Sequence, residues 1–100
     1  MTGMILSNEP GYYKEGHWGI RIETLQVVTP PEAIPGGERP MHGFRQLTLA
    51  PLDRKLIDVD LLTFDERAYV DAYHAEILAT VGPLLPGEVR DWLKVQAAPL

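Results

Sequence analysis

Residues 7–23, SNEPGYYKEGHWGIRIE, decide how the N-terminal part of the chain folds. Two stretches rich in aromatic and β-branched residues flank KEGH, residues 14–17, a composition typical of a turn. The first stretch follows a Glu-Pro-Gly run and the second ends in Arg-Ile-Glu. The segment therefore predicts an antiparallel hairpin that carries Glu9 on one arm and Glu23 on the other.

The expected pairing brings these two glutamates together. Glu9 and Glu23 are equally far in sequence from Gly16, so a turn centred on Gly16 places them opposite each other. Opposed side chains on one sheet face have Cβ atoms about 5 Å apart, where two carboxylates repel. Arg21 shares a strand face with Glu23 and would offset this repulsion. A divalent metal held by both carboxylates would also offset it.

A plain hairpin remains the alternative at this point. Glutamates are common on exposed strands, and a slip of one residue would place the two carboxylates on opposite faces. Spacing alone leaves both interpretations open.

The rest of the first half also predicts strands. Periodicity and turn residues indicate strands at 4–7, 12–13, 18–29 and 44–49, with a shorter extended piece at 55–61. Residues 30–43 are rich in proline and glycine, which excludes a helix or a central strand and predicts a surface loop.

Two helices are expected in the second half. Thr63 and Glu66 form a capping-box pattern that begins a helix ending near Val81, before Gly82. Its apolar side is expected to contain Tyr69, Val70, Tyr73, Ile77 and Val81. A second helix, 86–97, would present Val89, Trp92, Leu93, Gln96 and Ala97. Strands followed by helices predict an α+β fold with an antiparallel sheet.

Composition limits the classes of function. With 100 residues and a net charge of −5, the chain has the size of one small domain and lacks the basic surface that nucleic acids or anionic membranes require. It has no cysteine, which excludes disulfides and zinc–thiolate sites. No basic leader or long apolar stretch is present, so we expect no signal peptide and a cytoplasmic location.

The motifs EPGYY and GIRIE, which contain Glu9 and Glu23, resemble the C-terminal part of metallopeptidases with the pita-bread fold. The most similar branch is the Xaa-Pro aminopeptidases (aminopeptidase P). The downstream FRQLTLAPLDRKLIDVDLLT, the helix segment YVDAYHAEI and the tail DWLKVQAAPL are similar to the longer, eukaryotic-type members. The resemblance thus covers nearly the whole chain.

The resemblance implies a role for four residues of the hairpin. Glu9 and Glu23 match the last two of the five protein ligands of a centre with two divalent metal ions, typically manganese, with zinc or cobalt as alternatives. Glu23 would bridge the ions. Glu9 would also relay a proton, and Tyr13 and Arg21 would hold the geometry of the site and help to position the substrate. The implied reaction removes the N-terminal residue from a peptide with proline second.

The chain departs from the family pattern in its missing ligands. The other three ligands, two aspartates and a histidine, lie upstream of the matched region, and His17, His42 and His74 do not match them. We expect these three histidines to be exposed or hydrogen-bonded. We therefore expect the chain to be part of a longer protein, to lack peptidase activity alone and to bind metal weakly at best.

The resemblance also implies a division of the chain and its partners. Residues 1–50 would belong to the catalytic domain and residues 51–100 would form a helical extension. The expected partners are the N-terminal part of the same protein, a second copy in a homodimer, and the peptide substrate, with no nucleic acid or membrane. The alternative is a non-catalytic oligomerisation or protein-binding module derived from the same fold.

Overall fold

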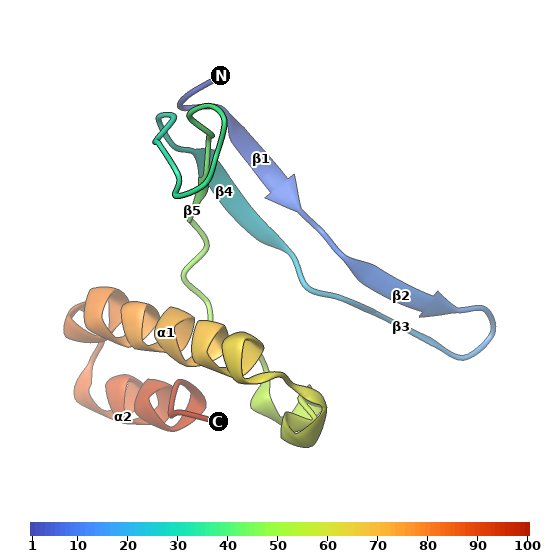
Figure 1. The fold of residues 1–100 in the computed structure, drawn as a ribbon. Coiled ribbons are helices and arrows are strands. Elements are labelled where there is room, and N and C mark those ends of the chain that lie inside the picture. The colour runs from blue at the N-terminus through green and yellow to red at the C-terminus, as the bar shows by residue number, and fades with distance from the viewer. The chain divides into compact units, whose positions relative to one another are not determined.

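The computed structural model describes residues 1–100 and divides them into two compact units, Met1–Thr48 and Leu49–Leu100. All the strands lie in the N-terminal unit and both α-helices lie in the C-terminal unit (Figure 1). Antiparallel strands followed by two helices confirm the expected α+β class. Neither helix combines the length and the apolar character that crossing a membrane requires.

The N-terminal unit contains a small sheet and a two-stranded ribbon that are continuous along the chain (Figure 1). The sheet has the strand order β1-β4-β5, and the ribbon pairs β2 with β3. Their bounds are β1 Ile5–Asn8, β2 Gly11–Lys14, β3 Trp18–Arg21, β4 Thr24–Val28 and β5 Phe44–Gln46. The strand expected at 18–29 is therefore two strands, β3 and β4.

Pro10 explains why the long strand is interrupted. The N–H of Ile22 donates to the carbonyl oxygen of Pro10 at 3.0 Å, but Pro10 has no N–H with which to return the bond. The same pairing register nevertheless runs through both sides of the break, with Asn8 opposite Thr24 and Gly11 opposite Arg21. The register expected from the sequence is confirmed.

The ribbon closes through the turn expected at residues 14–17. The N–H of His17 donates to the carbonyl oxygen of Lys14 at 3.0 Å. Gly16 has φ 70°, the sign that a type II turn requires at its third residue and that a side chain disfavours. The turn is thus set by the one residue type that fits it.

The prediction of an extended piece at 55–61 is wrong. The segment contains two 3₁₀ turns, Arg54–Leu56 and Val59–Leu61. Asp53 and Asp58 precede them, and their carboxylates accept from the N–H groups two residues later, at 3.0 and 3.2 Å. These local bonds offer the backbone an alternative to the extended form.

The helices begin and end close to the expected residues. Helix α1 (Phe64–Val81) has the full capping box: Glu66 N–H donates to Thr63 Oγ1 at 3.2 Å, and Thr63 N–H donates to the Glu66 carboxylate at 2.9 Å. A 3₁₀ turn, Gly82–Leu84, leads to α2 (Gly87–Gln96).

The core of the C-terminal unit lies between the two helices. Tyr73, Ile77 and Leu93 are buried at its centre. Four leucines and one valine, partly buried, pack against them: Leu49, Leu52, Leu78, Val81 and Leu85. Three residues expected on apolar faces are instead exposed, namely Tyr69 (55%), Val89 (40%) and Trp92 (58%). Their spacing is helical, but helices this short cover only part of each other.

Two adjacent side chains of α1 hold the backbone of the preceding segment. The Tyr73 hydroxyl donates to the carbonyl oxygen of Ala50 at 2.8 Å, and His74 Nε2 accepts from the N–H of Leu52 at 3.0 Å. His74 is fully buried. This segment is therefore fixed to the helix by its polar groups as well as by Leu52.

Arg54 and Asp71 hold the C-terminal tail. The Arg54 guanidinium donates to the carbonyl oxygens of Val95, Ala98 and Pro99, at 3.3, 2.9 and 3.2 Å. The carboxylate of Asp71 accepts from the N–H of Leu100 at 2.8 Å. Carbonyls that have no partner within the end of α2 thus find one in a side chain.

Candidate metal centre

The two candidate ligands lie at the break between the sheet and the ribbon. In the register that runs through both, Glu9 faces Glu23. The neighbouring pair Pro10–Ile22 is hydrogen-bonded, so by the alternation of an antiparallel ladder the Glu9–Glu23 position is the non-hydrogen-bonded kind. Opposed residues approach most closely at such positions, with Cα atoms about 4.5 Å apart.

Arg21 neutralises part of the negative charge at this position. Its guanidinium lies 3.0 Å from the Glu23 carboxylate, and both side chains are about half exposed (50% and 46%). The Tyr13 hydroxyl oxygen, as an acceptor for the guanidinium, and then the charge of Glu23 raise the pKa of Arg21 above its ordinary value. Three of the four residues singled out from the sequence, Tyr13, Arg21 and Glu23, are thus linked by contacts.

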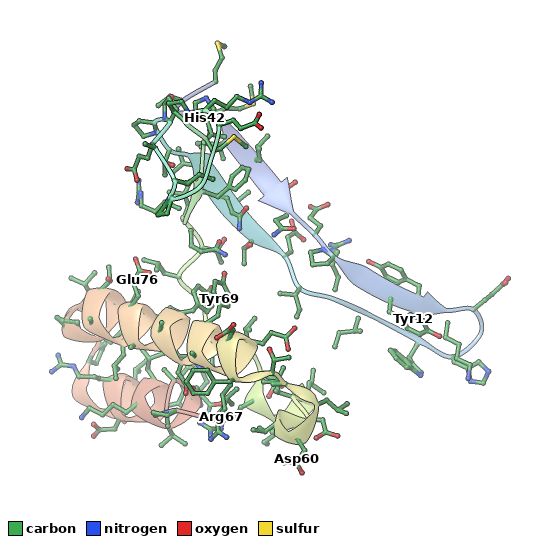
Figure 2. The ribbon with its side chains drawn as sticks, in the orientation of Figure 1. Tyr12, His42, Asp60, Arg67, Tyr69 and Glu76 are labelled. Atoms are coloured by element: carbon green, nitrogen blue, oxygen red, sulfur yellow. The ribbon has the colours of Figure 1, made fainter.

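The ribbon has one polar face and one apolar face. Because side chains alternate along a strand, Tyr13 and Arg21 share the face of Glu23. Tyr12 lies on the other face, with its ring centroid 5.3 Å from that of Trp18 (Figure 2 labels Tyr12 on this ribbon). A shallow, mostly apolar depression beside them is lined by Pro10, Gly11, Tyr12, Ile20 and Ile22.

Gly11 and Gly19 complete the polar face, and the sequence reasoning gave them no role. A Cβ atom on Gly19 would lie 2.5 Å from Cδ1 of Tyr13, and one on Gly11 would lie 2.8 Å from the Tyr13 hydroxyl oxygen. The Tyr13 ring therefore occupies the space that side chains at both positions would fill. The signal in the sequence is that both glycines share the expected strand face of Tyr13.

The donor atoms fit part of a metal centre. Two carboxylates are hard oxygen donors of the kind that Mn²⁺ accepts. No group of three or more histidine, cysteine, aspartate or glutamate side chains occurs that could hold a metal ion. The chain therefore brings together two carboxylates, Glu9 and Glu23, without a third candidate ligand beside them.

The three histidines are separated from the two glutamates in sequence, and the hydrogen bonds that they make go to other groups. His17 is in the ribbon turn, and His42 Nδ1 lies 2.7 Å from the carbonyl oxygen of Thr29. His74 is in the C-terminal unit. Each is exposed or hydrogen-bonded, as expected.

Known proteins resemble this chain over nearly its full length. "Probable Xaa-Pro aminopeptidase P" of Laccaria bicolor is 42% identical over 105 residues, which cover 99% of this chain and 16% of the relative. The protein of the same description from Coprinopsis cinerea is 42% identical over 103 residues, again with 99% and 16% covered. The chain thus spans about one sixth of the length of these relatives.

A solved structure shares the fold. The X-prolyl aminopeptidase of Caenorhabditis elegans, described as a cytosolic enzyme with a di-nuclear active site, matches with a TM-score of 0.89 at 28% identity. The match covers 100% of this chain and 17% of the enzyme.

A family model described as the C-terminal region of peptidase M24 matches residues 40–100. Both helices, the segment bound by Tyr73 and His74, and strand β5 lie within this range. The chain therefore belongs to the family of the M24 peptidase C-terminal region.

Proposed function

We propose that this chain is the C-terminal portion of an aminopeptidase with two metal ions that removes the N-terminal residue from peptides whose second residue is proline. The opposed pair Glu9 and Glu23, with Arg21 at 3.0 Å from Glu23, is the observation that carries this proposal. The descriptions of the relatives support the reaction and its substrate class.

Glu9 and Glu23 are proposed as metal ligands, with Glu23 bridging both ions. Mn²⁺, or alternatively Zn²⁺ or Co²⁺, would polarise the scissile carbonyl and lower the pKa of the attacking water. Glu9 would also accept a proton and pass it on. Arg21, with the Tyr13 hydroxyl beside it and the Glu23 carboxylate at 3.0 Å, would hold that carboxylate in place and balance its charge.

The chain alone is proposed to be inactive. Two carboxylates leave most positions around two metal ions to water, and no third ligand lies near them. The purified chain, incubated with Mn²⁺ and a Xaa-Pro peptide, is expected to release no N-terminal residue. Cleavage that a chelator abolishes would contradict this.

The activity of the whole protein is tested in a chimera. The segment of the C. elegans enzyme that matches this chain is replaced by the chain, because the two share the same fold. The chimera should cleave Xaa-Pro peptides, and Glu9→Gln or Glu23→Gln should lower kcat/KM by more than about 100-fold, since even outer-shell changes cost 10- to 100-fold in affinity or activity.

Glu15→Gln, in the ribbon turn, serves as the control for a lost glutamate and should leave the rate of the chimera unchanged. If the chimera cleaves normally with both Glu9 and Glu23 replaced, the proposed ligand assignment is wrong.

The proposed partners follow from the same assignment. The N-terminal part of the aminopeptidase would supply the remaining ligands, and a second copy would form a homodimer. A cytoplasmic location is proposed because the C. elegans relative is described as cytosolic.

A further inference from the structure

Gly19 and Gly11 of the ribbon have no backbone reason to be glycine. Positive φ values occur only at Gly3, Gly16 and Gly36, so neither position adopts a conformation that a side chain disfavours. Glycine inside a strand also weakens it, by about 0.5–1 kcal/mol relative to alanine. Some other requirement must account for two glycines on the same face of a short ribbon.

The space above the two glycines is taken by Tyr13. Gly19 lies directly opposite Tyr13 in the register. A Cβ at Gly19 would approach the ring carbon Cδ1 to 2.5 Å, well inside the 3.5–4.0 Å at which carbon atoms pack. At Gly11 the Cβ would meet the hydroxyl end of Tyr13, at 2.8 Å. The ring thus extends along the ribbon from Gly19 towards Gly11.

This direction carries the Tyr13 hydroxyl to Arg21. Gly11 is the cross-strand partner of Arg21, so a hydroxyl above Gly11 lies beside the Arg21 side chain. The hydroxyl lies close enough to the guanidinium to raise the pKa of Arg21, and the guanidinium is paired with Glu23 at 3.0 Å. A continuous series of contacts therefore runs from Gly19 through Tyr13 and Arg21 to Glu23.

We propose that Gly19, and to a lesser degree Gly11, are positioning residues for the carboxylate of Glu23. Their missing side chains let the Tyr13 ring lie along the ribbon, where its hydroxyl fixes Arg21 and Arg21 fixes Glu23. The inference rests on the proposed function, because it concerns the same carboxylate. An added methyl group at Gly19 would come within 2.5 Å of the ring near its base, whereas one at Gly11 would meet its hydroxyl end at 2.8 Å.

If the Tyr13 ring only packed over the two glycines, substitution of its hydroxyl would have a different result. Aromatic rings commonly cover glycines in strands and stabilise them, and that effect needs the ring but not the hydroxyl. The positioning role needs both. Tyr13→Phe separates the two, since it keeps the ring and removes the group that bonds Arg21.

The experiment uses NMR on the 100-residue chain, with Mn²⁺ as the probe. Paramagnetic broadening of the amide signals of Glu9 and Glu23 reports even weak binding, and the Arg21 Nε–H signal reports whether the guanidinium is held. Gly19→Ala should weaken Mn²⁺ binding about 10-fold, the lower end for an outer-shell change, and release Arg21. Gly11→Ala should have the same effect in weaker form.

Matched controls accompany each change. Gly87→Ala adds a methyl group where no atom lies within 4 Å and should change neither signal. Tyr13→Phe should release Arg21 and weaken Mn²⁺ binding while the ribbon contacts between Lys14 and Trp18 persist. Tyr12→Phe, on the opposite face, should change neither reading. In a Tyr13→Ala background, Gly19→Ala should have no further effect.

The outcomes distinguish the two proposals. If Glu9→Gln and Glu23→Gln leave the Mn²⁺ broadening unchanged, the metal assignment fails. If those changes abolish the broadening but Gly19→Ala and Tyr13→Phe do not weaken it, the positioning role fails while the metal assignment stands. If Gly19→Ala unfolds the ribbon, Tyr13→Phe decides, and an unaltered Arg21 signal in that variant overturns the inference.

Discussion

At the scale of single residues, His74 makes the stability of the helical unit dependent on pH. It is fully buried, and its Nε2 accepts from the N–H of Leu52, so this nitrogen cannot carry a proton in the folded chain. Burial, followed by the positive charge of Arg54, lowers the pKa of His74, against a smaller opposing effect of Asp71. Protonation therefore favours the unfolded chain.

The free energy of unfolding should fall as the pH drops below about 6.5, the ordinary value for histidine, and should be fully retained above it. The slope for one group is at most about 1.4 kcal/mol per pH unit. Urea unfolding followed by far-UV circular dichroism, from about pH 8 to about pH 5, measures it. His74→Gln keeps an acceptor and removes the titrating group, so it should flatten the curve.

His17→Gln is the matched control, because His17 lies exposed in the ribbon turn. It should keep the pH dependence of the wild-type chain. An equally steep curve in His74→Gln would mean that another group causes the loss of stability.

At the scale of elements, the capping box should matter more than the helix sequence around it. Thr63→Ala removes the oxygen that accepts from the N–H of Glu66 and should cost about 1 kcal/mol in the free energy of unfolding. Thr80→Ala, exposed near the other end of α1, should have a small effect of opposite sign, because alanine is the better helix former. Denaturant unfolding compares the two, and equal costs would argue against a capping role.

Elements were predictable where one local rule acted alone. Thr63 and Glu66 mark the start of α1, and glycine at 16 marks the turn, because each satisfies a specific backbone need. The two 3₁₀ turns in the segment predicted as extended, 55–61, do not follow from the sequence pattern. The carboxylates of Asp53 and Asp58 accept from backbone N–H groups two residues later, which the alternation of apolar residues does not reveal. The break in the second strand depended on Pro10, a residue in the opposite arm.

At the scale of the whole molecule, the ribbon exposes an apolar face that should drive self-association. Tyr12, Trp18, Ile20 and Ile22 are all exposed, Trp18 by 57%, and the ribbon edges offer unpaired backbone groups. Light scattering should show a mass that rises with concentration. Ile20→Lys should suppress this rise.

Ile34→Lys is the control, since Ile34 is also exposed (50%) but lies in the loop at 30–43. That variant should associate like the wild type. A monomer at high concentration in the wild-type chain would contradict the role given to the ribbon face.

The candidate site was only partly predictable from sequence. The spacing about Gly16 placed Glu9 opposite Glu23, and residue alternation placed Arg21 beside Glu23, since both follow from strand geometry alone. The path of the Tyr13 ring over Gly19 was not foreseen, because a side-chain rotamer is chosen by the space around it. The function of these residues as metal ligands remains a prediction.

The hydrogen bonds that Arg54 and Asp71 make with the tail fix the last residues to the helical unit. Arg54 donates to three carbonyl oxygens near the end of the chain, and Asp71 accepts from Leu100 N–H. A fluorophore or spin label attached at Leu100 would consequently tumble with the helices instead of swinging on a loose tether. Orientation-sensitive spectroscopy of this chain can therefore use that position as a fixed reference.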